Sequence, residues 1–323
     1  TRFGRAMMRG SHYGNVIKHL EVAHLTELPI PMLDELIGET HDHIAEALTA
    51  RDEAYHMDTA ARTRFANAMD DQPNMASEDG YTVPASRLFG GRRRLEAKAH
   101  SPSSTFIART YQRNASDVTA LKEIAQVYLP SRFKRIYGET GTTFVDSEPI
   151  FRINPELTKF LAPATKIDFD SYMVQDGWLL MARSGQTYGI NGQAILSNQW
   201  HRDKVLTEDI IRIIPKPNCV RSGYLQTVLS HPTLGKPLVV SRAFGTSVPH
   251  LAPEDIEQLP IPRLACDVEN EIADAAEQAS ELRMRADESE NAAVAKLEIE
   301  LAQKLGLTLD DRRRGPQRFS QVA

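Results

Sequence analysis

The sequence contains only two cysteines, Cys219 and Cys266, among 323 residues. Two cysteines cannot form a disulfide framework or a four-cysteine zinc site, and such low usage is typical of a reducing cytosol. We expect both to be ordinary buried thiols. The chain also lacks any apolar run near the roughly 18 residues that a membrane span needs, and no secretory signal opens it. These absences predict a soluble, cytoplasmic protein.

Motifs of enzyme active sites are missing as well. The segment LGKP at residues 234–237 has proline where a phosphate-binding loop has its magnesium-binding hydroxyl. No GxGxxG follows a predicted strand, and HExxH, GxSxG and the Asn/Asp-Pro-Pro-aromatic tetrapeptide of amino-methyltransferases do not occur. The triplet Glu96-Ala97-Lys98 resembles half of a nuclease motif, but no convincing upstream Asp is placed on a strand. The sequence therefore favours a protein without catalytic residues.

Histidines do not indicate a metal site. His41, His43 and His56 lie on one predicted helix, but their spacings of two and thirteen residues place them on different faces. We expect these side chains to be solvated, and we predict no metal bound by this chain.

Acidic residues are concentrated in two segments. The net charge is −5, but residues 32–70 carry three basic and nine acidic side chains, and residues 265–305 carry four and eleven. The remainder is therefore net positive. Because the charge of a domain governs its attraction to phosphate, the total does not exclude a nucleic-acid partner.

The sequence contains an internal repeat. HLEVAHLTELPIPML at residues 19–33 returns as HLAPEDIEQLPIPRL at residues 250–264, and seven of fifteen positions match at an offset of 231. Such a match indicates a duplication. Each copy leads into one of the acidic segments. The second proline of each LPIP can begin a helix there, because its missing N–H would be unpaired at that position.

Both acidic segments have the heptad pattern of a helix that packs along one stripe. We predict helices over residues 32–73 and 265–305, paired antiparallel about a pseudo-two-fold axis as a rigid spacer. A solvated amphipathic helix on another domain is the alternative. The predicted seam comprises Ile37, His41, Ile44, Leu48, Arg51 and Tyr55 in the first helix and Val268, Ile272, Ala275, Ala279, Leu282, Ala286, Ser289 and Ala293 in the second.

Residues 74–264 have a different pattern, with short apolar or alternating runs broken by Gly, Pro, Asn and Asp. The runs at 142–153, 178–185 and 209–218 predict strands, and SGYLQTVLS at 222–230 predicts a short helix capped by Ser222. Residues 72–104 are polar and irregular, as in a long exposed loop or a partly disordered segment. The predicted fold class is α+β, with a β-rich globular domain and two long antiparallel helices in a tandem repeat.

Basic and hydrogen-bonding side chains cluster in the turns of this domain, which is itself net positive with 23 basic and 19 acidic residues over 71–264. Arg and Lys bind phosphates or guanine edges, and Gln can pair with adenine. A single polar loop is more often a solvated surface, but several on a positive domain favour DNA binding. GGRRR at 90–94 is either a phosphate-binding arm or a solvated loop. The candidate DNA-binding residues are Arg132, Lys134, Arg135, Tyr137, Arg183, Gln186, Tyr188, Arg202, Lys204 and Arg242, and Arg221 is a further basic side chain of the same domain.

These features together resemble the specificity subunit of type I restriction-modification enzymes, which is called HsdS. The resemblance covers nearly all of residues 1–305. It includes the segment 121–155, which is similar to the family's opening strand pair, and the stretch DGWLLMARSGQTYG at 176–189. The repeat motif consists of Gly14, His19, Leu20, Leu28, Pro29, Ile30 and Pro31 in the first copy and Gly245, His250, Leu251, Leu259, Pro260, Ile261 and Pro262 in the second.

The resemblance implies a recognition protein that is not itself an enzyme. In that family two target-recognition domains, held apart by paired helices, each read half of a split double-stranded DNA sequence. Two methyltransferase subunits dock on the helices, and restriction subunits join them. S-adenosylmethionine, ATP and Mg would bind to these partners, which methylate adenine and cleave DNA, and this chain would bind no cofactor.

The resemblance also implies a division into domains. Residues 1–31 would be the remnant of a first recognition domain, residues 32–73 and 265–305 the spacer helices, residues 74–264 the second recognition domain, and residues 306–323 a basic tail. The first domain is almost wholly absent, so the chain is either a fragment or a half-subunit that dimerises, and its start inside a repeat without Met favours a fragment.

Two other classes stay open. One is a coiled-coil scaffold whose globular domain binds protein. The other is a self-contained DNA nuclease or methyltransferase.

Overall fold

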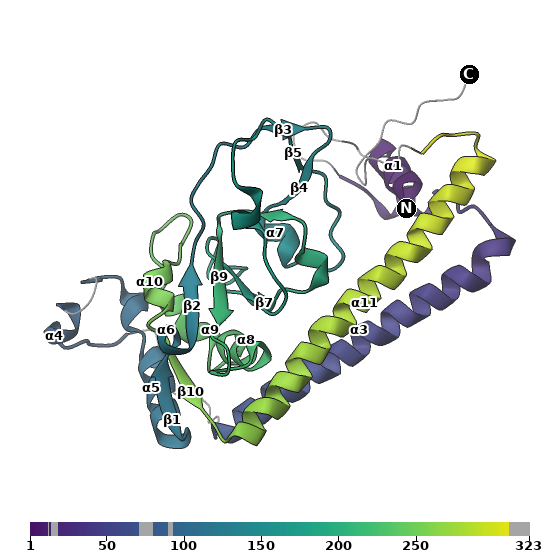
Figure 1. Ribbon diagram of the computed structural model, residues 1–323. Helices are drawn as coiled ribbons and strands as arrows, with labels where there is room; N and C mark the ends of the chain where they lie inside the picture. The colour runs from purple at the N-terminus through teal and green to yellow at the C-terminus, as the bar shows by residue number, and fades with distance from the viewer. Residues whose placement is uncertain (12, 14–18, 71–79, 90–92, 310–323) are drawn as a thin grey trace.

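A computed structural model describes residues 1–11, 13, 19–70, 80–89 and 93–309 (Figure 1). Gly14 of the first repeat, part of the polar segment 72–104, most of GGRRR and most of the predicted basic tail 306–323 lie outside these residues. The described chain consists of a pair of long helices and a mixed domain against one side of the pair (Figure 1). No helix in this part of the chain is long and apolar enough to cross a membrane.

The two predicted long helices are α3 (Asp34–Ala68) and α11 (Cys266–Lys304). They run antiparallel, because residues early in α3 contact residues late in α11. Glu39 is paired with Lys296 near one end and Arg64 with Glu271 near the other. Between them, Arg51 lies 2.9 Å from Asp287. The helices begin at Asp34 and Cys266, a few residues after the LPIP prolines and not at them.

Alanines form the centre of the contact between the helices. Ala47, Ala50 and Ala54 of α3 are buried with Ala279, Leu282 and Ala286 of α11. Small side chains at these positions let the two helix axes approach closely. The structure also buries Ile272, Ser289 and Ala293 of the predicted α11 seam, and it leaves Val268 and Ala275 half-buried.

The predicted seam of α3 is wrong by one position. Leu48 is 56% and Tyr55 67% exposed, Ile37 and His41 are also exposed, and Ile44 and Arg51 are half-buried. The contact stripe instead contains Ala47, Ala50 and Ala54, which correspond to Ala279, Leu282 and Ala286 at an offset of 232 residues. The LPIP copies are offset by 231. One residue has therefore been gained or lost between hinge and helix, and the ungapped frame places the apolar stripe on the wrong side of α3.

The mixed domain is built on an antiparallel sheet with the order β2 (Ala125–Tyr128), β9 (Ile210–Pro215), β6 (Leu179–Ala182) and β7 (Ala194–Leu196). Strands β6 and β9 lie within the predicted runs, as does β4 (Thr142–Val145). Side chains alternate between the two faces of the sheet. Ile211 and Ile213 face the largest core, whereas Ile210 faces a second core.

Helices cover the first face of this sheet and make the domain less purely β than predicted. They are α5 (Pro102–Asn114), α8 (Ser222–Ser230) and α9 (Lys236–Ser241). Helix α8 matches the predicted range, but its N-cap is Arg221, and the Ser222 hydroxyl donates to the Gly177 carbonyl at 2.5 Å. The largest core also includes Phe65 of α3 and Ile272 of α11, so the helix pair is built into the domain. The α+β class is confirmed.

A smaller sheet covers part of the second face. Its order is β3 (Tyr137–Gly138), β5 (Phe160–Leu161), β4 and β8 (Val205–Leu206), with β4 and β8 parallel. The short helical segments of the described chain are α1 (Arg2–Gly10), α2 (Val22–Thr26), α4 (Ala85–Leu88), η1 (Ala97–His100), α6 (Leu121–Ile124), α7 (Ser147–Ile150), η2 (Phe169–Tyr172), η3 (Gln199–His201) and α10 (Pro253–Ile256).

A two-stranded sheet joins the start of the domain to its end. Strand β1 (Asp117–Ala120) pairs with β10 (Pro260–Arg263), immediately before α11. Pro260 and Pro262 therefore belong to a strand, not to a helix start as predicted. Proline is tolerated there because a strand with a single neighbour has unpaired N–H positions.

The duplication is visible in the backbone. Tyr13 and His19 form an isolated antiparallel bridge, and Phe244 and His250 form its counterpart 231 residues later. In each copy a short helix (α2 or α10) and then a long helix (α3 or α11) follow in the same order.

The prediction of two buried cysteines is wrong. Cys219 and Cys266 are free and exposed, in the turn after β9 and at the start of α11. Each lies at an element boundary on the surface, which the apolar character of the side chain does not indicate.

Candidate nucleic-acid interface

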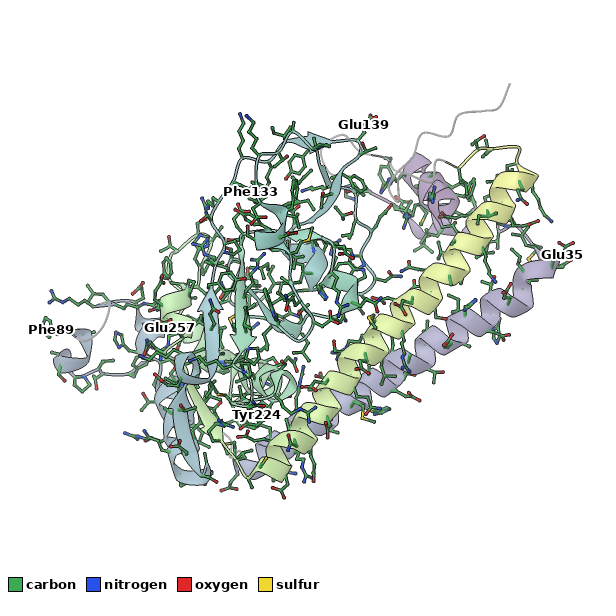
Figure 2. The ribbon with its side chains drawn as sticks, viewed as in Figure 1. Glu35, Phe89, Phe133, Glu139, Tyr224 and Glu257 are labelled. Atoms are coloured by element: carbon green, nitrogen blue, oxygen red, sulfur yellow. The ribbon has the colours of Figure 1, made fainter. Side chains whose placement is uncertain are left out.

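Two of the predicted basic segments meet at one edge of the β2–β9–β6–β7 sheet. Strands β2 and β6 are both antiparallel to β9, so both end where β9 begins. The β2–β3 loop (residues 129–136) and the β6–β7 loop (residues 183–193) therefore leave the sheet at this edge. The β8–β9 turn (residues 207–209) lies between them. Figure 2 shows Phe133 of the β2–β3 loop at the end of the domain farther from Tyr224 of α8.

Glu208 of the turn anchors the β2–β3 loop. Its two carboxylate oxygens each accept a hydrogen bond of 2.8 Å from the Arg135 guanidinium. The same guanidinium lies over the Phe144 ring, 4.9 Å from its centroid. A charge-assisted pair of this kind, stacked on an aromatic ring, holds an arginine in one orientation.

Asp209 anchors the β6–β7 loop in the same way. It accepts hydrogen bonds from Arg183 at 3.0 Å and from the Ser184 hydroxyl at 2.9 Å. Ser184 Oγ also lies 2.6 Å from His250 Nδ1, which ties the loop to the repeat motif. This is not a hydrolase triad, because the aspartate binds the serine and not the histidine.

The far part of the β6–β7 loop faces outward. Gln186 donates to the Ser247 carbonyl at 3.0 Å, and the Gly189 N–H donates to the Gln186 carbonyl at 2.9 Å, which closes a turn. Tyr188 stands between these contacts and is 89% exposed. Gly185 has φ +134°, a conformation that other residues rarely adopt. The loop is thus held at its base and leaves an aromatic side chain in solvent.

Free positive charge comes from the β2–β3 loop. Arg132 and Lys134 are exposed, and neither has an ion-pair or hydrogen-bond partner within the described chain. Tyr137, which follows the loop, is exposed too, and Lys159 Nζ lies 6.0 Å from its ring centroid. This edge therefore presents cations and aromatic rings together, a combination that suits phosphates and bases.

The structure places the remaining candidates elsewhere. Arg202 is bound to Asp176, which precedes β6, whereas Arg183 follows β6, so the two arginines lie at opposite ends of the strand. Lys204 Nζ lies 4.9 Å from the centroid of the Trp200 ring. Arg221 binds Asp274 at 2.6 Å and Glu277 at 2.5 Å on α11 and so joins the domain to the helix pair.

Arg242 and Arg94 lie beside the 244–250 turn. Burial lowers the pKa of Arg242 below its ordinary value. Arg94, from the GGRRR run, donates to the carbonyls of Arg242 at 2.8 Å and of Ser241 at 3.3 Å, at the end of α9. Arg94 is thus a structural anchor and not part of a solvated arm. The three candidate metal histidines are not gathered: His41 and His56 are exposed, and His43 Nδ1 lies 3.2 Å from the Ser289 hydroxyl.

Sequence reasoning missed a buried arginine behind this edge. Arg212 of β9 is 0% exposed, and burial lowers its pKa to about 10. Its guanidinium donates to four backbone carbonyls, three of them on either side of the β8–β9 turn and one, that of Tyr172, in η2. The signal was present, because Arg212 is a single charged residue within the apolar run IIRII.

A second missed feature is a cavity of about 560 Å³ between the domain and the helix pair. Tyr55 of α3, Phe151, and Trp200 and His201 of η3 are among its lining residues. Burial lowers the pKa of His201 to about 4. This cavity lies on the side of the domain that faces the helices, and Gln193 at the end of the β6–β7 loop is also among its lining residues.

The fold is therefore that of a mixed α+β domain mounted on an antiparallel helix pair, with a duplicated hinge. No protein-family model matches the sequence, and no curated protein matches it. Among solved structures, the chain is similar to the type I restriction-modification system S subunit from M. genitalium, with 12% identity and a TM-score of 0.38 over 91% of this chain and 66% of that one.

Two further solved structures are similar to the same degree. The HsdS subunit from Thermoanaerobacter tengcongensis gives 12% identity and a TM-score of 0.38 over 98% of this chain and 68% of that one. A structure that describes complex assembly and conformational transition of the type I R-M system gives 13% identity and a TM-score of 0.38 over 94% of this chain and 64% of that one. The chain spans about two thirds of their lengths. These are structures of the family that the repeat motifs resemble, and the similarity concerns the fold.

Proposed function

We propose that this chain is a sequence-specific DNA-recognition subunit of a type I restriction-modification complex. The observation that carries the proposal is the edge at which the β2–β3 and β6–β7 loops meet. Both loops are held from behind by Glu208 and Asp209, and both present side chains to solvent. Loops fixed at their base and open at their tips suit the reading of base edges, which requires defined geometry.

The exposed side chains of the two loops would have different roles in DNA binding. Arg132 and Lys134 would neutralise phosphates and set the register of the domain on the duplex. Gln186 and Tyr188 would approach the bases, because a glutamine amide can pair with adenine and a tyrosine ring can contact apolar base edges. Arg135 and Arg183 are already paired with carboxylates, so we assign them to holding the loops.

The duplicated hinge supports a second reader. Ile261 of the second copy, in β10 beside β1, is 0% exposed, whereas its counterpart Ile30 is 81% exposed. Leu25 is likewise exposed, and its counterpart Ile256 is buried. A second recognition domain, from this polypeptide or from another chain, would cover these apolar side chains. The helix pair would then hold two readers apart, so that each reads one half of a split site.

The chemistry would reside on partner subunits. Methyltransferase subunits docked on the helix pair would flip an adenine out of the duplex and methylate it from S-adenosylmethionine. Exposed apolar side chains on α3, such as Ile37 and Leu48, support a docking role for the pair. This chain would contribute recognition only.

The test is a selection from a pool of duplexes with randomised sequence, using the purified full chain. We expect enrichment of one short half-site motif, with binding that weakens steeply as salt rises. A chain that enriches no sequence and binds without salt dependence is a protein scaffold and not a DNA reader. Incubation of the same chain with DNA, Mg²⁺ and S-adenosylmethionine should yield neither cleaved nor methylated DNA, whereas product would indicate a self-contained enzyme.

A further inference from the structure

Arg212 is a charged residue in apolar surroundings. It lies in the middle of β9, opposite Leu180 of β6 and Tyr128 of β2. Alternation along the strand places its side chain on the same face as Ile210, whose cluster includes Val145, Leu180 and Leu206. Removing a guanidinium from water into such a cluster is unfavourable unless hydrogen bonds compensate.

Backbone carbonyls supply this compensation for both terminal nitrogens, whereas the buried Nε has no hydrogen-bond partner among the described residues. Nη1 donates to the carbonyls of Ile210 at 2.9 Å and Thr207 at 3.3 Å. Nη2 donates to the carbonyls of Leu206 at 3.1 Å and Tyr172 at 3.2 Å. No carboxylate of the described residues lies within ion-pair distance of Arg212. The guanidinium thus binds the backbone on both sides of the β8–β9 turn and not an acidic partner.

Three of those carbonyls flank the two residues that anchor the loops, and the fourth, that of Tyr172, belongs to η2. Leu206 and Thr207 precede Glu208, and Ile210 follows Asp209. An arginine that binds carbonyls on both sides of a turn determines its conformation, and with it the directions of the Glu208 and Asp209 side chains. A continuous series of contacts therefore links Arg212 to both loops. Arg212 binds the backbone of the turn, and in the turn Glu208 binds Arg135 at 2.8 Å and Asp209 binds Arg183 at 3.0 Å.

An apolar residue would satisfy the packing of β9 but would leave these buried carbonyls without their donors. We propose that Arg212 is a positioning residue for DNA recognition, which fixes the β2–β3 and β6–β7 loops through the β8–β9 turn without touching DNA. This inference rests on the proposed function. It differs from a purely structural role because it predicts a selective effect on the two loops.

The test compares Arg212→Met and Arg212→Lys with Ile213→Val, a conservative change on the opposite face of the same strand. Affinity is measured against the duplex that the parent chain enriches. We expect Arg212→Met to bind about tenfold more weakly, the order of a lost charge-assisted hydrogen bond. The slope of affinity against salt should not change, because no phosphate contact is removed. Arg212→Lys should lie between, and Ile213→Val should bind like the parent.

Two measurements separate positioning from general destabilisation. Amide hydrogen exchange should increase in residues 129–136 and 183–193 of Arg212→Lys while α8 keeps its protection. A double-mutant cycle with Asp209→Ala should show that the two losses do not add, because both act through the same turn. Unchanged affinity in a folded Arg212→Lys or Arg212→Met variant, or fully additive losses, would overturn the proposal.

Failure of the proposed function is distinguishable from failure of this inference. If the parent chain enriches no duplex, DNA recognition is refuted, and the hydrogen-exchange comparison alone decides whether Arg212 orders the two loops. Unchanged exchange in both loops would then overturn the positioning role as well.

Discussion

At the scale of single residues, the arginines of the two loops have different roles that composition does not reveal. Arg135 and Arg183 are bound to carboxylates, whereas Arg132, three residues before Arg135, is exposed and unpaired within the described chain. An arginine with a bidentate carboxylate partner would have to lose that partner before binding phosphate. The phosphate contacts should therefore come from Arg132 and Lys134.

Replacing both Arg132 and Lys134 with alanine should lower the magnitude of the salt slope of DNA binding by roughly two, because each phosphate contact contributes about one. The slope is obtained from affinities at several salt concentrations. Arg152→Ala is the control, since Arg152 is an exposed arginine that is paired with Glu148 and lies on the side of the domain that faces the helix pair. Arg152→Ala removes one charge where the double variant removes two, so a reduction of about one in the control would mean that only net charge matters.

His201 should make stability depend on pH. Its pKa in the folded protein is about 4, below the ordinary value of 6.5, because burial disfavours the imidazolium. As pH falls, the unfolded chain therefore takes up a proton on His201 before the folded protein does. The contribution of neutral His201 to folding stability is complete above pH 6.5 and is lost between pH 6.5 and about 4. The difference between the two pKa values corresponds to about 3 kcal/mol of unfolding free energy.

The measurement is chemical denaturation of the parent and of His201→Asn at several pH values. The gap in unfolding free energy between them should narrow as pH falls from 6.5 to 4. A gap that stays constant over this range would show that His201 is not buried in its neutral form.

At the scale of elements, the long helices were predictable because heptad periodicity and turn signals are local in sequence. The face of α3 that packs against α11 was not predictable, because inserting or deleting one residue after the hinge rotates the helix by about 100°. The exposed Leu48 and the buried Ala54 make the difference testable.

Ala54→Leu should destabilise the protein by about 1–3 kcal/mol, because it inserts a larger side chain where α3 meets α11 in close contact. Leu48→Ala should change stability by less than about 0.5 kcal/mol, since Leu48 is exposed. Thermal or denaturant unfolding of both variants is the measurement. The reverse order of effects would restore the ungapped frame and contradict the observed seam.

At the scale of the whole molecule, the domain and the helix pair form one unit. Arg221 binds Asp274 and Glu277, and the backbone N–H of Asn154 donates to Asp287 at 3.3 Å. Gly223 of α8 lies against α11: a Cβ on it would lie 2.4 Å from the Ala273 carbonyl oxygen. The position of the proposed DNA-binding edge relative to the helix pair depends on this contact.

Gly223→Ala should therefore destabilise the protein by about 1–3 kcal/mol, because α8 and α11 must separate to admit a methyl group. Gly38→Ala is the control, since nothing lies within 4 Å of a Cβ there and alanine favours a helix. That variant should be slightly stabilised. Denaturant unfolding measures both changes, and a neutral Gly223→Ala would mean that the domain does not need this close approach to α11.

The sequence by itself determined the duplication, the two long helices, the main strands of the domain and the basic loops. Each of these features depends on a local pattern: periodicity, turn residues or repetition. Only the tertiary structure decided which charges are free and which are anchored. Arg183 and Asp209 are 26 residues apart, and Arg135 and Glu208 are 73 apart. Antiparallel pairing of β2, β6 and β9 brings them to one edge, and no local pattern encodes that meeting.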